Sequence, residues 1–196
     1  MKSGFGKLFL IGLIAFVLFL WVRGSYNGMV TTREEVNTAW SKVEGAYQRR
    51  ADLIPNLVNT VKGVANFEQK TLTDVINARA SATQVKLDPN NMDEAAMKKF
   101  QDSQSSLGGA LGRLLVVAEN YPQLKATESF RDLQVQLEGT ENRINTERNN
   151  FNDVAKLYNT NIQKFPANIF ASMFGFKTRP YFQAAEGSDK APTVNF

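Results

Sequence analysis

An uninterrupted apolar run at residues 8–22 differs from the rest of the chain, which is polar and patterned for helix. The run reads LFLIGLIAFVLFLWV and contains no charged side chain. As a helix it spans roughly 22 Å, and residues 3–7 extend it to about the 30 Å thickness of a hydrocarbon core. The pattern therefore predicts a transmembrane anchor over residues 1–25.

A cleaved signal peptide is the competing interpretation, because a positive start and an apolar run fit it as well. Cleavage needs small residues at the −3 and −1 positions, whereas Trp21, Val22 and Arg23 end the run and no A-x-A-like pattern follows. We therefore expect an uncleaved anchor. The positive charges on its two sides are nearly balanced, and those nearest the run favour an N-terminus inside the cell and an extracytoplasmic domain.

From residue 36 onward, apolar residues recur at alternating steps of four and three, the spacing of helices that pack in a bundle. The first seam consists of Val36, Trp40, Val43, Tyr47, Arg50, Ile54, Leu57, Val61 and Val64. Leu72 and Val75 continue it, so the pattern predicts one helix to about Thr83, kinked at Pro55 by the missing backbone N–H. Only two glycines disfavour helix at residues 24–32, and we expect the anchor to continue through them into this helix.

Two further seams follow, one over residues 97–121 and one over residues 130–165. Turns at residues 87–91 and 121–126 separate the three helices that these seams predict. Three glycines between residues 108 and 112 lie inside the second helix, where each costs about 1 kcal/mol relative to alanine. We expect a neighbouring helix to approach closely there.

Three long helices joined by short loops run antiparallel and bury their seams against one another. A shorter amphipathic segment follows at residues 167–176, and residues 177–196 have the composition of a loosely ordered tail that contains aromatics. The predicted fold class is all-α. An N-terminal transmembrane helix continues into an elongated antiparallel bundle of three long helices plus a short C-terminal helix, with the bundle domain over residues 26–176.

Composition excludes several classes of function. The chain has no cysteine and no histidine, which excludes thiol nucleophiles, disulfides and imidazole acid–base catalysis. Its net charge of +4 comes from Lys and Arg scattered among acids, so we expect no nucleic-acid partner. The sequence contains no glycine-rich phosphate loop or dinucleotide fingerprint. We therefore expect no cofactor, no metal site and no enzymatic activity.

Two polar clusters on the first and third predicted helices form the candidate site. Its residues are Arg49, Arg50, Asp52, Pro55 and Asn56 on the first helix and Glu141, Arg143 and Glu147 on the third. We favour an interhelical ion-pair network that fixes register, with Glu141 or Glu147 opposite the arginines. The alternative is that the guanidinium groups, beside carbonyls freed by the proline, hold an anion or a lipid headgroup.

Two other features leave alternatives open. The phenylalanine-rich segment 169–182 either caps the open end of the bundle, which we favour, or docks on a membrane surface or partner. The third helix is rich in asparagines, which form surface and seam hydrogen bonds or line a groove for a partner. These asparagines are Asn145, Asn149, Asn150, Asn152, Asn159 and Asn161.

Several motifs together resemble the LemA family of bacterial membrane proteins. They are RRADLIPNLVNTVKG at 49–63, AENYPQLKA at 118–126, TENRI at 140–144, ERNNFN at 147–152 and YNTNIQKFP at 158–166. The resemblance covers about residues 26–182, and Phe151 stands where tyrosine is common in the family. It implies a single N-terminal transmembrane helix that carries a long helical bundle, without an established enzymatic activity.

The sequence thus leads to two hypotheses about function. The first is a membrane-anchored, non-enzymatic scaffold or adaptor in the bacterial inner membrane, with an extracytoplasmic bundle. Its partners would be the lipid bilayer, other membrane or envelope proteins, and a second copy of the chain. The second is a sensing module that binds a ligand or lipid headgroup through Arg49, Arg50 and the Glu141–Arg148 cluster.

Overall fold

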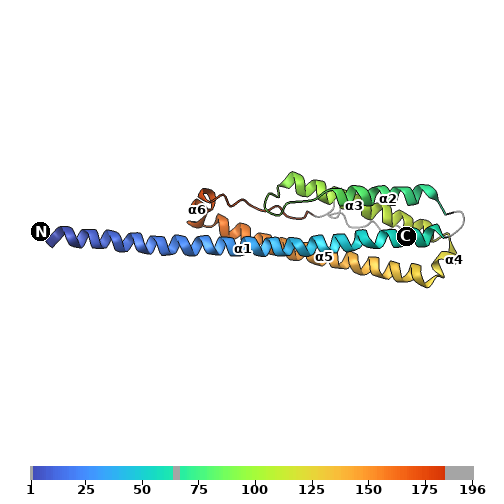
Figure 1. Cartoon of the computed structure of the whole chain (residues 1–196), viewed down its shortest axis with the longest axis horizontal. Helices are drawn as coiled ribbons and strands as arrows, with labels where there is room; N and C mark the ends of the chain where they lie inside the picture. The colour runs from blue at the N-terminus through green and yellow to red at the C-terminus, as the bar shows by residue number, and fades with distance from the viewer. Residues whose placement is uncertain (1, 64–66, 184–196) are drawn as a thin grey trace, which may run out of the picture.

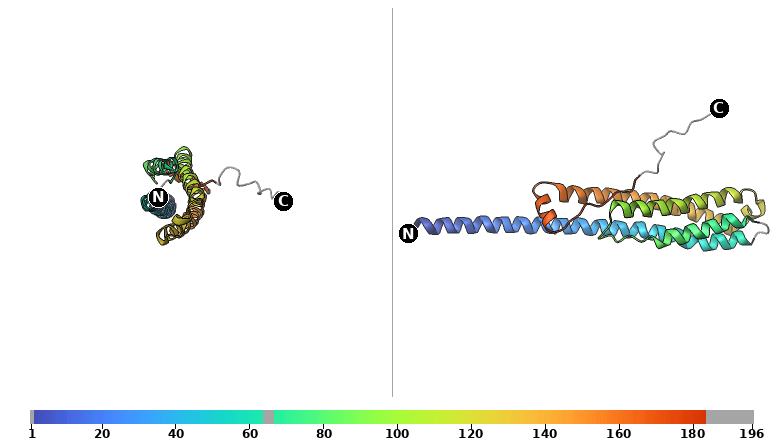
Figure 2. Two further views of the ribbon diagram at one scale, coloured as in Figure 1. Left: turned by 90° about the vertical axis from the view of Figure 1, so that its right-hand side faces the viewer. Right: turned by 90° about the horizontal axis from the view of Figure 1, so that it is seen from above.

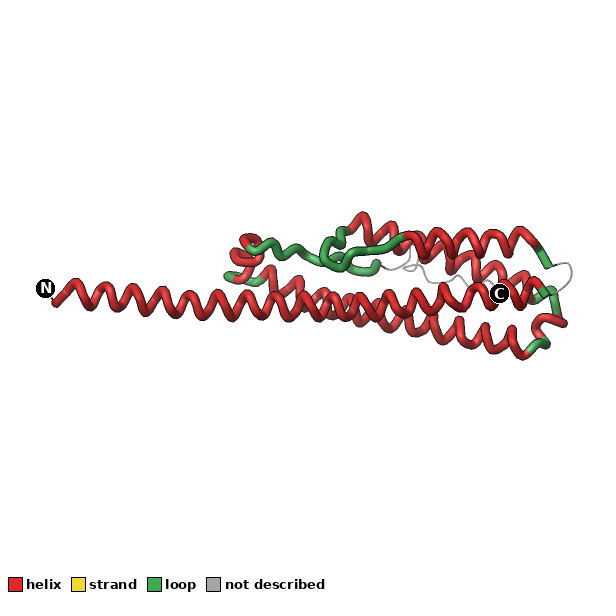
Figure 3. The backbone as a smooth tube through the Cα atoms, viewed as in Figure 1, coloured by secondary structure: helices red, strands yellow, loops and turns green. Residues whose placement is uncertain are grey.

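The computed structural model describes residues 2–63 and 67–183, and all regular structure within them is helical. The helices are α1 (Lys2–Lys62), α2 (Gln69–Gln84), α3 (Glu94–Ala118), α4 (Pro122–Lys125), α5 (Glu128–Gln163) and α6 (Ala167–Met173). The predicted all-α fold, with an N-terminal helix that continues into an antiparallel bundle, is confirmed. The loops lie at the helix reversals and after α6 (Figure 3).

Helix α1 is continuous from the apolar run into the bundle, as predicted for residues 24–32. It carries one stretch long and apolar enough to cross a membrane. Leu8 is 70% exposed and Trp21 41% exposed, and the intervening large apolar side chains are exposed as well. This part of α1 projects alone beyond the bundle (Figure 1). The helix also continues through Pro55 to Lys62.

The prediction that the first helix reaches Thr83 is wrong. Helix α1 ends at Lys62, and α2 runs back in the opposite direction to pack against α3 (Figure 1). The reason lies in α5, the main neighbour of α1: the contacts Thr32–Asn161 and Arg50–Glu141 set an antiparallel register. In that register the first turn of α5 faces the last turns of α1, so a longer α1 would have no surface of α5 to cover its seam. The chain therefore forms two helix pairs, α1 with α5 and α2 with α3 (Figure 2).

The hydrophobic core has two parts along the bundle. The part nearer the projecting end of α1 centres on Trp40, whose ring lies 5.3 Å from that of Phe100 and 5.6 Å from that of Phe151. The distal part contains fully buried leucines, among them Leu57 and Leu114. We call these the proximal core and the distal core.

Helix α6 and the residues that follow it close the proximal core. Ala171 of α6 is buried, and Phe170 and Phe176 pack against the proximal core. Residues 177–183, which we name the C-terminal strap, then run along the bundle in extended form (Figure 1). The prediction of a loosely ordered tail from residue 177 is wrong for the strap, because Arg179 and Phe182 are buried. The rest of that tail, residues 184–196, lies outside the described residues.

The glycines of α3 do not serve the expected close approach of a helix. A Cβ atom added at Gly112 would meet nothing within 4 Å, and one added at Gly108 would meet only the Arg50 guanidinium, at 3.9 Å. Gly108 and Gly109 border the polar groove described below rather than a helix contact.

Candidate functional site

A buried arginine lies where the proximal and distal cores meet. Arg50 occupies a seam position of α1 and is 4% exposed. One terminal nitrogen donates to the carboxylate of Glu141 on α5 at 2.9 Å. The other donates to the backbone carbonyl of Gln104 on α3 at 3.1 Å and to its side-chain oxygen at 2.7 Å. The guanidinium also lies 5.1 Å from the ring of Tyr47, within cation–π range.

Gln104 extends this contact to the fourth helix, because its side-chain nitrogen donates to the Ala82 carbonyl of α2 at 3.2 Å. Hydrogen bonds therefore join α1, α2, α3 and α5 at one level of the bundle. We call Arg50, Ala82, Gln104 and Glu141 together the Arg50 junction. A buried guanidinium is stable only with its partners in place, so the junction disfavours any sliding of one helix along another.

Pro55 creates a second connection, one turn further along α1. Proline has no N–H, so the carbonyl of Ala51, four residues earlier, has no helical donor. The Nε–H of Arg79 on α2 donates to this carbonyl at 2.7 Å. The proline thus turns a carbonyl of α1 into an acceptor for α2, which satisfies a buried backbone group.

The structure brings together only part of the predicted cluster. Arg50 and Glu141 pair across helices, whereas Glu147 pairs at 2.7 Å with Arg143 on its own helix. Arg49 and Asn56 are exposed, as is Asp52, which accepts a hydrogen bond from Gln48 at 2.7 Å.

Sequence reasoning missed two residues of the site. Gln104 had a signal, because it is a polar residue at a seam position of α3. Nothing in the seam pattern marked Arg79 as part of the site. Pro55 leaves the carbonyl of Ala51, four residues earlier, in need of a hydrogen-bond donor. Only the tertiary structure shows that this donor comes from α2.

Two asparagines of α5 hold the C-terminal strap as a neighbouring strand would. The Asn159 side chain donates to the Arg179 carbonyl and accepts from the Arg179 N–H, both at 2.8 Å. Asn152 makes the same pair of bonds with Phe182, at 3.1 and 2.8 Å. Seven helical residues span about 10.5 Å and three extended residues about 10 Å, so the two spacings match.

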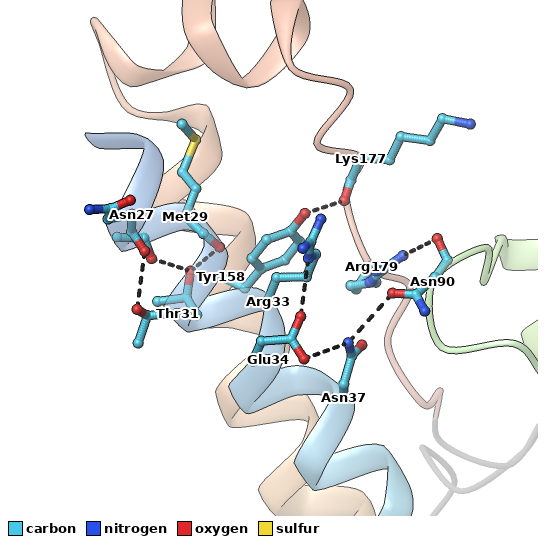
Figure 4. A network of polar contacts seen from close by, with 12 residues as sticks. Asn27, Met29, Thr31, Arg33, Glu34, Asn37, Asn90, Tyr158, Lys177 and Arg179 are labelled. Atoms are coloured by element: carbon cyan, nitrogen blue, oxygen red, sulfur yellow. Dashed lines mark hydrogen bonds and ion pairs between the residues drawn. The ribbon is translucent and has the colours of Figure 1, made fainter. Parts of the chain in front are cut away.

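Further polar contacts join the strap to α5 and to the turn before α3, and join that turn to α1 (Figure 4). The Tyr158 hydroxyl donates to the Lys177 carbonyl at 2.9 Å, and Arg179 donates to the Asn90 carbonyl at 3.2 Å. The side chain of Asn90 also accepts from Asn37 of α1 at 3.5 Å. The asparagine-rich face of α5 is thus occupied, in part, by this chain's own strap.

Burial shifts the pKa values of three groups in these contacts. It raises the pKa of Tyr47, and the Arg148 and Arg50 charges oppose that shift. Burial likewise raises the pKa of Tyr158 and lowers that of Arg179, and the interaction between the two opposes both shifts.

An open groove of about 620 Å³ lies beside the Arg50 junction. Its charged lining includes Lys98, Asp102 and Arg148 together with Arg50 and Glu141. In the part of the chain that the structure describes, Asp and Glu residues form no group of three that could hold a metal ion. The groove therefore offers charges of both signs and hydrogen-bond donors rather than a metal-ligand set.

The sequence model of the LemA family matches residues 39–196. The chain belongs to the LemA family. It is 29% identical to Magnetosome protein MamQ 2 of Paramagnetospirillum magneticum and to Magnetosome protein MamQ of Magnetospirillum gryphiswaldense, over 91% of this chain and 71% of each relative. It is 26% identical to Protein LemA of Metamycoplasma hominis, over 91% of this chain and 78% of that protein. None of these names states a reaction.

Proposed function

We propose that this LemA-family protein is a membrane-anchored, non-enzymatic scaffold that presents the sides of its bundle to other proteins of the bacterial envelope. The observation that carries the proposal is the continuity of α1, whose exposed apolar part extends without a break into the buried seam. Because this helix is unbroken, the bundle is held at a fixed distance from the membrane that the helix crosses. The Arg50 junction keeps that bundle in one register.

We propose that the anchor crosses the inner membrane once and that the bundle is extracytoplasmic. Lys2 and Lys7 precede the apolar run and Arg23 follows it, which favours the N-terminus inside the cell. Protease treatment of intact cells and of cells with a permeabilised outer layer tests the side. Digestion of the bundle only after permeabilisation supports the proposal, whereas resistance until lysis contradicts it.

The partners are tested by capture from intact membranes. The full chain, cross-linked in membranes and purified, is compared with a chain lacking residues 1–25. We expect envelope proteins, or a second copy of the chain, to co-purify with the full chain and to be lost with the truncated one. Recovery of the full chain alone contradicts the scaffold proposal, and turnover of an envelope substrate by the purified protein contradicts its non-enzymatic character.

The groove beside the Arg50 junction supports a second candidate, a module that binds an anion or a lipid headgroup. Lys98 lines the groove and Lys99, its neighbour on α3, does not, so the two give a matched pair of variants. If the groove binds inorganic phosphate or vesicles containing phosphatidylglycerol, Lys98→Gln weakens binding several-fold and Lys99→Gln leaves it unchanged. Equal effects of both variants contradict a groove site.

A further inference from the structure

The outer face of α6, together with Phe165 before it and Phe174 after it, is apolar and largely exposed. Phe165 is 82% exposed, Ile169 52%, Met173 72% and Phe174 48%. These side chains are exposed, whereas the opposite face of α6 closes the proximal core. We call these four residues the α6 outer face. An exposed apolar patch of this kind marks a contact with a partner or a membrane.

Helix α6 lies directly beside the end of the apolar part of α1. The ring of Phe170 lies 5.4 Å from that of Trp21, and the ring of Phe174 lies 5.0 Å from that of Tyr26. Among the residues that the structure describes, only those of α1 extend beyond α6 toward the N-terminus (Figures 1 and 2). Through Phe174, the α6 outer face therefore adjoins α1 just beyond the exposed apolar surface of the anchor.

The depth of α6 follows from the geometry of α1. Trp21 is the penultimate residue of the apolar run, and tryptophans are typical of the membrane–water interface. The headgroup layer beyond the hydrocarbon core is about 5–7 Å thick on each side, and α1 rises about 7.5 Å from Trp21 to Tyr26. A membrane crossed by the run thus places α6 within the headgroup layer, where apolar faces of amphipathic helices insert about 5–10 Å.

We propose that the α6 outer face inserts into the same bilayer that α1 crosses. This inference rests on the proposed role of α1 as an anchor and adds a second membrane contact to it. Two contacts restrain the tilt of the bundle, because α1 alone would be free to lean. Exposed Lys164 and Lys177 flank α6 in the sequence, and their charges complement anionic headgroups.

The absence of cysteine from the sequence makes the test direct. The full chain receives one spin label at a time, at Ile169→Cys, Met173→Cys, Ile14→Cys or Val135→Cys, in vesicles of phosphatidylcholine and phosphatidylglycerol. Ile14 reports the anchor, and Val135, exposed on α5 beyond the Arg50–Glu141 pair, reports the far part of the bundle. Accessibility to oxygen and to a water-soluble nickel complex gives the depth of each label by electron paramagnetic resonance.

We expect the label at 14 to lie deep in the hydrocarbon, those at 169 and 173 to lie at headgroup depth, and that at 135 to lie in water. If the labels at 169 and 173 lie in water while the label at 14 lies in lipid, the inference is overturned but the anchor still stands. That result is expected if the α6 outer face binds a protein partner instead. An aqueous label at 14 contradicts the anchor itself. A spin label at Phe165→Cys gives an independent measurement of the depth of the α6 outer face. Circular dichroism verifies that each variant folds.

Discussion

At the scale of single residues, Pro55 shows how a local defect becomes a contact between helices. The proline removes the donor that the Ala51 carbonyl would have in a regular helix. Arg79 supplies a donor from α2, at 2.7 Å. The contribution of Arg79 should therefore depend on the proline, and this dependence can be measured.

We expect Arg79→Ala to lower the free energy of unfolding by about 1–3 kcal/mol, because it leaves a buried carbonyl without a donor. In a Pro55→Ala background the new backbone N–H can bond to Ala51, so the same substitution should cost about 1 kcal/mol less. A double-mutant cycle by denaturant titration of the detergent-solubilised protein measures the difference. Equal costs in both backgrounds would show that Arg79 acts without reference to the proline.

Tyr47 gives a pH-dependent prediction at the same scale. Burial raises its pKa, so the folded state holds the phenolic proton more tightly than the unfolded state does. The resulting stabilisation is fully present below about pH 10, the ordinary tyrosine pKa, and is lost as the pH rises toward the folded-state pKa. Tyr47→Phe should therefore lose less stability than the wild type between pH 9 and about pH 11. Urea titrations of the wild type and of Tyr47→Phe at the two pH values measure this difference. Equal losses of unfolding free energy in the two proteins would contradict the role of Tyr47.

At the scale of elements, the glycines differ in what they do for the helices. Gly45 lies inside α1, and a Cβ atom added there would meet nothing within 4 Å. Gly175 follows α6 with φ at +73°, a backbone conformation that residues with a Cβ rarely adopt. The first position only weakens a helix, whereas the second allows the chain to turn from α6 into the C-terminal strap.

We expect Gly45→Ala to raise the free energy of unfolding by about 0.5–1 kcal/mol, because alanine favours the helix. Gly175→Ala should lower it by about 1 kcal/mol, because alanine is strained at positive φ. Thermal or denaturant unfolding of the two variants gives the signs. A destabilising effect at Gly45 would reveal a contact of this face of α1 that the folded chain alone does not contain.

At the scale of the whole molecule, the Arg50 junction decides how the helices are aligned. It joins all four bundle helices at the boundary between the proximal and distal cores. Apolar seams with a regular repeat pack nearly as well after a shift of one heptad, whereas a buried guanidinium has only one set of partners. The junction therefore selects one alignment from several that the apolar pattern allows.

We expect Arg50→Ala to lower the free energy of unfolding by about 2–4 kcal/mol, because it leaves a cavity and removes the partner of Gln104. Glu141→Gln should cost only about 1 kcal/mol, since Glu141 is half exposed and the amide oxygen still accepts a hydrogen bond. Denaturant titration compares the two, and amide hydrogen exchange follows the helices separately. A neutral Arg50→Ala variant would show that the apolar seams align the bundle unaided.

The sequence determined the local features of this protein: the apolar run, the continuity of α1 through residues 24–32, the seams and the all-α class. These follow from helix periodicity and hydrophobicity, which act over a few turns. It also indicated that Arg50 faces the interior and that a glutamate of α5 lies opposite, because a charged residue at a seam position needs a partner. The family resemblance was readable from motifs alone.

Only the tertiary structure decided where α1 ends, which donor serves Ala51, and what the asparagines of α5 hold. The seam continues in phase beyond Lys62, but α5 begins level with the end of α1, so the chain folds back instead. The C-terminal strap has the mixed composition of a loose tail, yet Asn152 and Asn159 hold its backbone at Phe182 and Arg179, and both of these residues are buried. Each of these outcomes depends on contacts between segments far apart in the chain, which no local pattern encodes.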